Sequence, residues 1–335
     1  MDLRFLGSTG VKVSSLCLGT MTFGTKWEHV ATSDQKLVDS MVAMALDHGI
    51  NFFDTANVYS AGESEEQLGR ALKGRRREDF LIATKVRGRT GPGPNDVGLS
   101  RHHIRNELDA SLKRLGVDYI DLYQVHGWDR ATAVEETLDA LDDAVREGKV
   151  RLIGASNHAG WQLMKALAAS DRRGLARYVS LQALYNAIQR DLEYELVPLS
   201  LDQGLAILPW SPLAGGFLTG KYRRGQTRPE GARRTDREKA YLQFDEERGF
   251  DLIDALDVVA KNHGATVSQA ALQWLLARPG VTSVIIGART LAHLEDNLGA
   301  VTWKITPEEV ATLDAISSMP RVYPYWMIDQ FHQTR

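Results

Sequence analysis

Short apolar runs alternate with amphipathic segments along most of this chain, and that alternation limits its possible folds more than any other feature. Candidate strands begin near Leu16, Ile50, Leu81, Tyr119, Val150, Val179, Leu205 and Thr282. Repeated strand and helix units form parallel sheets whose faces are covered by helices. An open doubly wound sheet also alternates, but no G-x-G-x-x-G motif follows an early strand here. The sequence therefore favours a closed (β/α)8 TIM barrel.

Helix signals lie between the candidate strands. Residues 32–35 form a possible capping box, and apolar residues at helical spacing follow as far as Ala45, before Gly49. Similar patterns predict helices near residues 63–73, 101–115, 131–147, 160–172, 192–203, 250–263, 268–277 and 307–318. We expect residues 1–335 to form one barrel domain, because barrels of about 250 residues tolerate long insertions.

Three segments fall outside the repeated unit. Residues 3–6 and 11–13 flank a Gly-Ser-Thr-Gly turn and predict an N-terminal hairpin that could plug the base of the barrel. Residues 214–248 are rich in glycine and arginine, including Arg223, Arg224, Arg228, Arg233, Arg234 and Arg237. So long a loop is usually functional, and we interpret it as a lid. The aromatic tail at residues 323–327 either caps a pocket or packs on the barrel wall.

Composition excludes several classes of function. Lysine and arginine total 40 against 43 acidic residues, so no basic excess attracts nucleic acid or an anionic membrane. No stretch approaches the roughly 18 apolar residues of a membrane span. The single Cys17 forms no internal disulfide, and the charged start lacks the apolar segment of a secretory signal. We expect a cytoplasmic protein, monomeric or oligomeric.

Ionisable residues stand where four neighbouring parts of the barrel rim should meet. Asp54, Lys85 and His126 each end a predicted strand, and Tyr59 follows Asp54 by five residues. In barrels the reactive groups lie at these carboxyl ends. Taken singly, each has an ordinary alternative: a loop cap, a solvated lysine or a structural histidine.

Together these four residues predict carbonyl chemistry. Tyrosine, with an ordinary pKa of about 10, is a useful acid near neutrality only beside groups that stabilise its phenolate. Lys85 supplies that positive charge, and Asp54 pairs with Lys85 to orient it. His126 then polarises the substrate oxygen, which becomes an alkoxide when the carbonyl carbon accepts a hydride. No set of metal ligands competes for these residues.

Four segments resemble the motifs of the aldo-keto reductase family, in the family's order. Residues 49–59 resemble its aspartate and tyrosine motif, including the spacing, and residues 83–86 resemble its lysine motif. Residues 124–126 resemble its histidine motif, and residues 148–157 its middle signature. The resemblance extends over nearly the whole chain and, more distantly, to the potassium-channel β subunits.

The resemblance implies a catalytic tetrad of Asp54, Tyr59, Lys85 and His126. Tyr59 would be the general acid in reduction of a small carbonyl compound, and its phenolate the base in the reverse oxidation. The implied cofactor is NADP(H), with NAD(H) possible, extended across the barrel mouth. Ser156, Asn157 and Gln182 would hydrogen-bond the nicotinamide carboxamide, and Trp210, which stands where the family more often has tyrosine, would stack on its ring. Gly19, Thr20, Met21 and Asp54 are further implied cofactor contacts.

The phosphate end of the cofactor also has candidate residues. Gly287 to Thr290 join the last strand to a helix, where barrels often bind phosphate, and Arg289 could clamp a ribose phosphate. By position, the resemblance implies that Ser211, Pro212, Leu213, Gly215 and Lys221 cover the pyrophosphate and that Asp296 and Asn297 contact the adenine. His293 stands where the family commonly has Arg or Gln. The glycines after residue 213 would allow close backbone approach, although a plain glycine-rich turn is the alternative.

The substrate pocket and the biological role stay open at this level. Met21, Phe23, Tyr59 and Trp128 are candidate walls of the pocket, and core packing is an equal alternative for each apolar one. A nucleotide-binding regulatory subunit with little turnover is a second reading of the chain. A third, an isomerase or aldolase that uses Lys85 as a Schiff base, fits poorly beside Asp54 and Tyr59.

Overall fold

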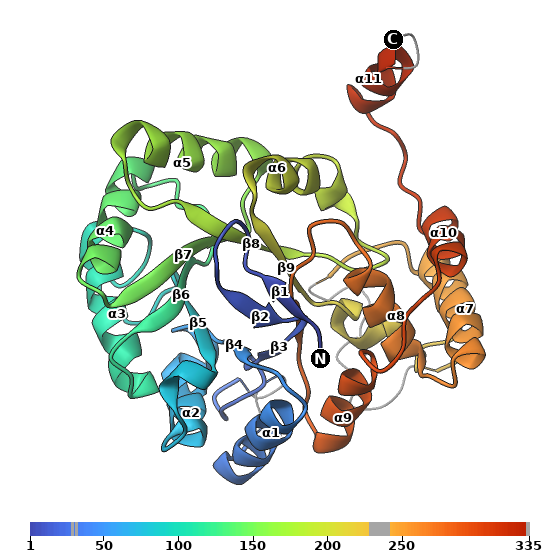
Figure 1. The fold of residues 1–335 in the computed structure, drawn as a ribbon, viewed down its shortest axis with the longest axis horizontal. Helices are drawn as coiled ribbons and strands as arrows, with labels where there is room; N and C mark the ends of the chain where they lie inside the picture. The colour runs from blue at the N-terminus through green and yellow to red at the C-terminus, as the bar shows by residue number, and fades with distance from the viewer. Residues whose placement is uncertain (28–29, 31–32, 228–241, 333–335) are drawn as a thin grey trace.

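Eight parallel strands close into a barrel in the computed structural model, which describes residues 1–27, 30, 33–227 and 242–332 (Figure 1). The strands are β3 (Leu16–Gly19), β4 (Phe52–Asp54), β5 (Leu81–Val86), β6 (Ile120–Val125), β7 (Val150–Ser156), β8 (Tyr178–Leu184), β9 (Ala206–Trp210) and β10 (Val284–Ile286). Each pairs with the next, and β10 pairs with β3. The ring closes where the amide of Thr282 donates to the carbonyl of Ile207 at 2.9 Å. The (β/α)8 prediction is confirmed.

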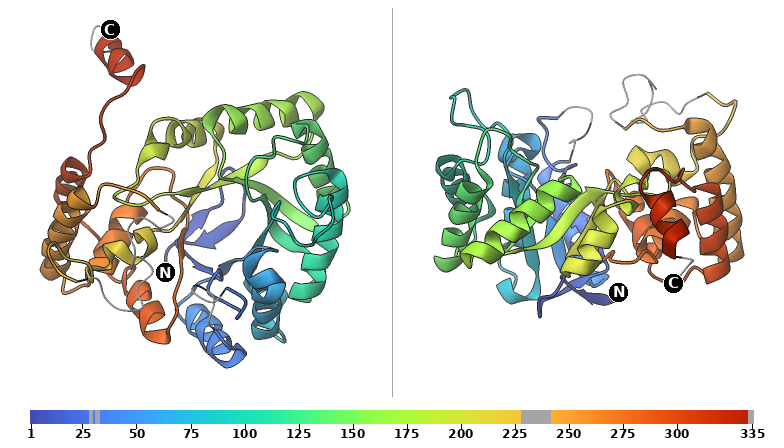
Figure 2. Two further views of the ribbon diagram at one scale, coloured as in Figure 1. Left: turned by 180° about the vertical axis from the view of Figure 1, so that it is seen from behind. Right: turned by 90° about the horizontal axis from the view of Figure 1, so that it is seen from above.

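The N-terminal hairpin seals one end of the barrel, as predicted. Strands β1 (Leu3–Phe5) and β2 (Lys12–Ser14) pair antiparallel. Leu6 and Val13 are fully buried and pack in the barrel interior with Cys17 and Phe52. Figure 2 shows the N-terminus at this end of the barrel and the loop after β5 rising at the other. The apolar plug therefore leaves only the opposite end of the barrel open for chemistry.

Helices surround the barrel and mostly follow the predicted bounds. They are α1 (Gln35–Asp47), α2 (Glu63–Leu72), α3 (Arg101–Leu115), α4 (Val134–Arg146), α5 (Gly160–Arg173), α6 (Leu196–Gln203), α7 (Glu246–Asn262), α8 (Val267–Leu276), α9 (Leu291–Gly299) and α10 (Pro307–Ile316). The predicted capping box of α1 partly lies outside the described residues, at Thr32, and Asp34 caps the helix by accepting from the amide of Leu37.

One predicted helix, at residues 192–203, is wrong as a single element. The structure divides it into a 3-10 turn, η3 (Asp191–Glu193), and α6, which begins at Leu196. Pro198 explains the break, because proline lacks an amide hydrogen and is tolerated only in the first turn of a helix. The helix therefore starts two residues before Pro198.

The predicted loop at residues 214–248 is shorter than expected at both ends. Its start forms a 3-10 segment, η4 (Ala214–Thr219), and its end belongs to α7. Phe217 is buried and stacks on Tyr222 with ring centroids 5.4 Å apart. Arg228, Arg233, Arg234 and Arg237 lie outside the described residues. The lid interpretation therefore stays a prediction.

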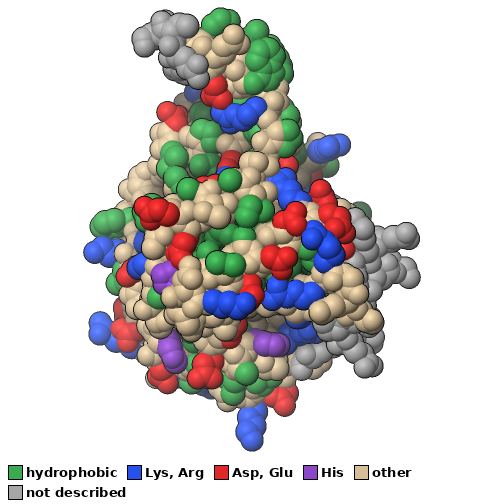
Figure 3. Space-filling view, turned by 90° about the vertical axis from the view of Figure 1, so that its right-hand side faces the viewer, with side chains coloured by type: hydrophobic (Ala, Val, Ile, Leu, Met, Phe, Trp, Pro, Cys, Tyr) green, Lys and Arg blue, Asp and Glu red, His purple; other side chains and the backbone are tan. Residues whose placement is uncertain are grey.

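The aromatic tail forms a helix that stands apart from the barrel. Helix α11 (Tyr325–His332) follows an extended segment after α10 (Figure 1). Tyr325 stacks on Tyr194, with centroids 5.4 Å apart, while the side chains of Trp326 and Phe331 are 47% and 64% exposed. Hydrophobic side chains accordingly gather on this projecting segment (Figure 3). Neither expected position, capping a pocket or packing along the barrel wall, describes it.

Across the described part of the chain, no helix is both long enough and apolar enough to cross a bilayer.

Candidate active site

A buried lysine lies at the centre of the candidate site, at the open end of β5. The ammonium of Lys85 donates to Asp54 Oδ1 at 2.5 Å, to the carbonyl of Thr55 at 2.8 Å and to the Tyr59 hydroxyl at 3.3 Å. Its side chain is fully buried. Neighbouring strands bring these groups together, because β4 and β5 pair with Asp54 opposite Ala83. Three of the four predicted catalytic residues therefore form one connected cluster.

Lys85 is held in its charged form. Burial alone would lower its pKa, but the Asp54 carboxylate and the Tyr59 hydroxyl together raise that pKa above the ordinary value. A protonated ammonium stabilises a neighbouring phenolate and is a poor nucleophile. The cluster therefore disfavours the Schiff-base reading of Lys85.

Tyr59 is placed by an unusual turn. It opens the 3-10 segment η1 (Tyr59–Gly62), in which Ser60 and Ala61 adopt positive φ angles of 47° and 53°. The Lys85 ammonium lies 4.9 Å from the centroid of the Tyr59 ring, and the His126 ring lies edge-on at 5.9 Å. Only 9% of Tyr59 is exposed. Strained turns of this kind are typical of functional sites.

His126 completes the predicted four and carries no charge near neutrality. Burial, followed by the positive charges of Lys85 and Arg87, lowers its pKa from 6.5 to about 3. A neutral imidazole can still donate one hydrogen bond through its protonated ring nitrogen. The arrangement therefore suits His126 to polarising an oxygen and leaves proton donation to Tyr59.

Two amide side chains also hold Asp54, and sequence analysis assigned neither to this task. Gln124 Nε2 donates to Asp54 Oδ2 at 3.1 Å and Gln182 Nε2 donates to the same oxygen at 2.8 Å. Gln124 is fully buried and lies opposite Lys85 in the β5 and β6 pairing. Gly154 leaves room for it, since a Cβ there would lie 3.2 Å from Gln124 Cγ. The only sequence signal was its position two residues before His126, on the same face of β6.

The predicted nicotinamide contacts lie directly beside this cluster. The Ser156 hydroxyl is buried without a hydrogen-bond partner among the described residues. Asn157 Nδ2 donates to the carbonyl of His126 at 3.0 Å, and Asn157 Oδ1 accepts from Trp210 Nε1 at 3.1 Å. Gln182 links the same area to Asp54. These residues fit a planar carboxamide with donors and acceptors on both sides.

The predicted pyrophosphate segment follows β9 at the same end of the barrel. Ser211 Oγ accepts from the amide of Gly215 at 3.2 Å. A Cβ on Gly215 would meet no atom within 4 Å, so the backbone there faces open space. Lys221 lies nearby, its ammonium 3.3 Å from the position of a Cβ on Gly216. Pro212 is buried and Leu213 is partly buried against the core, so both support the turn.

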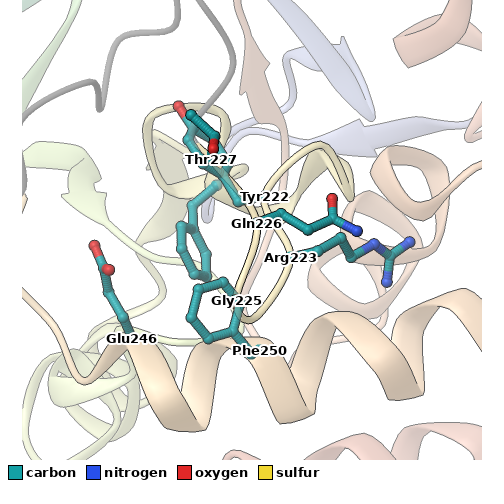
Figure 4. Close-up of a pocket in the computed structure, with 8 residues that line it drawn as sticks. Tyr222, Arg223, Gly225, Gln226, Thr227, Glu246 and Phe250 are labelled. Carbon is teal, nitrogen blue, oxygen red and sulfur yellow. The ribbon is translucent and has the colours of Figure 1, made fainter.

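A cavity of about 180 Å³ lies between η4 and the start of α7 and has Phe217 of η4 in its wall. Tyr222, Arg223, Glu246 and Phe250 line it, above the first turns of α7 (Figure 4). None of the predicted site residues contributes to it.

The predicted phosphate end lies between β10 and α9. Thr290 caps α9 by accepting from the amide of His293, and Arg289 immediately precedes the cap. Asn297 Nδ2 donates to the carbonyl of Gly287 at 3.3 Å, which ties the helix to the loop. Asp296 Oδ1 accepts from Thr266 Oγ1 at 2.8 Å, so its carboxylate already anchors the start of α8. The predicted adenine role of Asp296 therefore competes with this structural one.

Packing within the protein explains some of the predicted site residues at the end of β3. A Cβ on Gly19 would lie 2.6 Å from Ile285 Cγ2, so close strand packing explains this glycine. The buried Thr20 hydroxyl bonds the Ser64 hydroxyl at 2.7 Å, and Met21 is half-buried. Phe23 is fully buried and packs in the main core, as the alternative to its role as a pocket wall expects. Packing between strands and helices thus accounts for three of these four residues.

Two tryptophans border the mouth of the site. Trp128 is half-buried and packs edge-on against His158 at 5.6 Å. Trp27, which sequence analysis missed, packs edge-on against Tyr59 at 5.8 Å and is 36% exposed. No sequence pattern singled out Trp27, because its proximity to Tyr59 depends on how the loop after β3 folds back. Within the described residues, no cluster of three or more His, Cys, Asp or Glu could hold a metal ion.

Comparison with known proteins agrees with this geometry. The family model described as "Aldo/keto reductase family" matches residues 15–318. The chain is 41% identical to "Uncharacterized oxidoreductase YrpG" of Bacillus subtilis, across 96% of this chain and 97% of that protein. It is 38% identical to a "Probable voltage-gated potassium channel subunit beta" of Arabidopsis thaliana, across 90% and 91% of the two chains. It is also 35% identical to "Versiconal hemiacetal acetate reductase" of Aspergillus parasiticus, across 94% and 96%.

Proposed function

Because the chain belongs to the aldo/keto reductase family, we propose that it is an NADP(H)-dependent oxidoreductase that reduces aldehydes or ketones to alcohols. The observation that carries the proposal is the buried contact between the Lys85 ammonium and the Tyr59 hydroxyl, with Asp54 behind it. A charged lysine aimed at a phenol favours loss of the phenolic proton, which is what a tyrosine acid requires.

The four residues divide the proton chemistry. When bound, the reduced nicotinamide supplies the hydride that the carbonyl carbon accepts. Tyr59 donates its proton to the oxygen that becomes an alkoxide, and Lys85 stabilises the phenolate that is left. Asp54 keeps Lys85 charged and oriented, while neutral His126 donates a hydrogen bond to the same oxygen. In the reverse direction the phenolate accepts the proton of an alcohol.

Residues along the open end of the barrel would hold the cofactor. Ser156, Asn157 and Gln182 would bind the carboxamide, and Trp210 would contact the nicotinamide ring. The segment from Ser211 to Lys221 would cover the pyrophosphate, and the loop from Gly287 to Arg289 would bind the ribose phosphate. The orphaned Ser156 hydroxyl supports the first assignment, and the open space at Gly215 supports the second.

A regulatory subunit is the second candidate function, and the similarity to the Arabidopsis potassium-channel β protein favours it. Such a protein would bind the nucleotide tightly and turn over little. Sustained multiple turnover of small carbonyls without a partner would argue against it.

The test replaces Tyr59 with phenylalanine and follows reduced-cofactor absorbance over a panel of aldehydes and ketones, with NADPH and with NADH. Loss of the Tyr59 hydroxyl, which Lys85 contacts, should lower kcat by about 100-fold or more. Cofactor binding, measured by protein fluorescence, should be retained. Tyr123→Phe is the matched control, because the buried Tyr123 hydroxyl has no partner in the described part of the chain.

Two results of this test would contradict the proposal in different ways. A Tyr59→Phe protein that reduces carbonyls as fast as the wild type would show that another group donates the proton. A wild type that binds NADPH tightly but reduces none of the panel would favour the regulatory function.

A further inference from the structure

An arginine that the proposed reaction does not use lies on the rim of the site. Arg87 follows β5 two residues after Lys85, and its Nε donates to the carbonyl of Trp128 at 3.1 Å. Its Cδ lies 3.6 Å from the position of a Cβ on Gly127, and Asn157 Cβ lies 3.9 Å from the same point. Arg87 and Asn157 therefore both lie close to Gly127, the residue that follows His126.

The backbone at Arg87 is in a conformation that L residues rarely adopt. Its φ is +146°, one of the few positive values outside glycine in the described chain. The next residue, Gly88, passes so close to Val58 that a Cβ there would lie 2.4 Å from Val58 Cγ1. Strain of this kind persists where the surrounding structure requires it and is concentrated at functional sites. At this position the strained backbone places an arginine on the rim beside His126. A glycine would adopt the same φ angle without strain.

The charge of Arg87 is not paired by any acidic side chain of the described residues. Among the described residues no carboxylate lies within ion-pair distance of it, and the hydrogen bond that its side chain makes there goes to the backbone carbonyl of Trp128. Asp129 interacts electrostatically with Arg87, and its carboxylate accepts hydrogen bonds from the amides of Leu99 and Ala131 and from the Thr132 hydroxyl. The positive charge does reach the site, since it contributes to the lowered pKa of His126.

We propose that Arg87 binds a carboxylate carried by the carbonyl substrate, so that the preferred substrates are aldehydes or ketones with an acid group. The inference rests on the proposed function. The substrate oxygen must lie near Tyr59 and His126, and the nicotinamide near Asn157, so the rest of the substrate extends past the rim on which Arg87 lies. Two of the three guanidinium nitrogens remain for a carboxylate, whose two oxygens match the planar fork of arginine.

The experiment compares 3- and 4-carboxybenzaldehyde with 3- and 4-nitrobenzaldehyde, whose nitro group has the shape of a carboxylate but no net charge. The readout is the ratio of kcat/KM for the acid to kcat/KM for its nitro partner. Comparing this ratio between variants cancels the different intrinsic reactivities of the aldehydes. The variants are Arg87→Met, Arg87→Lys and Arg87→Gly, the last of which also relieves the positive φ.

Arg89→Met is the matched control, because it removes the same charge from the same loop. The Arg89 guanidinium donates to the carbonyls of Gly91 and Gly93 and so points back into its own loop. For at least one pair of isomers, Arg87→Met and Arg87→Gly should lower the ratio by about five- to tenfold, as expected for a lost charge-assisted hydrogen bond. Arg87→Lys should have an intermediate effect, and Arg89→Met should change the ratio by less than about twofold. Added salt should lower the ratio in the wild type.

Two results would overturn the inference: ratios unchanged in both variants that lack a positive charge, Arg87→Met and Arg87→Gly, or an equal fall in Arg89→Met. If the wild type reduces the nitro aldehydes but replacing Arg87 does not change the kcat/KM ratios, the proposed reductase function stands and only the carboxylate preference is wrong. If the wild type reduces none of the four aldehydes, the proposed function fails and this inference fails with it.

Discussion

At the scale of single residues, the site assigns proton donation to Tyr59 and polarisation of the substrate oxygen to His126. The Lys85 ammonium contacts the Tyr59 hydroxyl and not the His126 ring, whose pKa burial and nearby positive charge lower to about 3. A neutral His126 does not change its charge between about pH 5 and pH 8. If activity falls as the pH is lowered through that range, the protonation of another group should therefore be the cause.

The neutral state of His126 also predicts a pH dependence of stability. In the unfolded chain its pKa returns to 6.5, so between about pH 3 and pH 6.5 the unfolded chain binds a proton that the folded protein does not. Stability is then fully present above pH 6.5 and is lost as the pH falls towards 3, by about 2 kcal/mol from pH 7 to pH 5. Urea unfolding of the wild type and His126→Gln at about pH 7 and pH 5 measures this difference.

The variant should lose less stability on acidification than the wild type. His102→Gln, which changes an exposed histidine on α3, is the control and should behave as the wild type does. Equal losses in the wild type and in His126→Gln would mean that His126 is not held neutral.

At the scale of elements, the sequence predicts the features that follow from the periodicity of apolar residues and from the positions where strands end. Asp54, Lys85 and His126 were found because each stands where an apolar run stops, and parallel strands bring such positions to one rim. The division of η3 from α6 could have been read from Pro198. Gln124 and Trp27 could not, because their contacts with Asp54 and Tyr59 depend on side-chain direction and on a loop that folds back. The single-domain expectation stays a prediction.

Helix α9 gives a prediction at the same scale. Its cap, Thr290, bonds the amide of His293, and the helix amino end, where partial positive charge gathers, follows Arg289. If Arg289 binds the ribose phosphate that distinguishes NADPH from NADH, Arg289→Met should weaken NADPH binding about tenfold and NADH binding much less. Fluorescence titration with both nucleotides measures the two Kd values.

Arg172→Met is the control for that titration, because it removes a charge from the exposed end of α5. Equal weakening of both nucleotides by Arg289→Met would exclude the phosphate clamp.

At the scale of the whole molecule, the barrel and the C-terminal helix differ in how they are held. The barrel has a continuous core and a hairpin plug, whereas the contacts that join α11 to the rest include the Tyr325 stack on Tyr194 and a hydrogen bond from the Tyr325 hydroxyl to Glu195 at 3.2 Å. The ion pair between Arg321 and Asp329 lies within the segment itself. A chain that ends at Pro320 keeps the bond from the Tyr194 hydroxyl to the carbonyl of Pro320.

Such a truncated chain should therefore fold and retain its barrel. An aromatic pair contributes about 0.5–1.5 kcal/mol, so the thermal midpoint should fall by no more than about 3 °C. Calorimetry of the full-length and truncated chains measures the shift, and Tyr325→Ala, which removes the stack alone, should reproduce most of it. A fall of more than about 6 °C would contradict a barrel that is stable without α11. If that larger fall came with a smaller mass in sedimentation, it would mean that the exposed face of α11 is buried between copies of the chain.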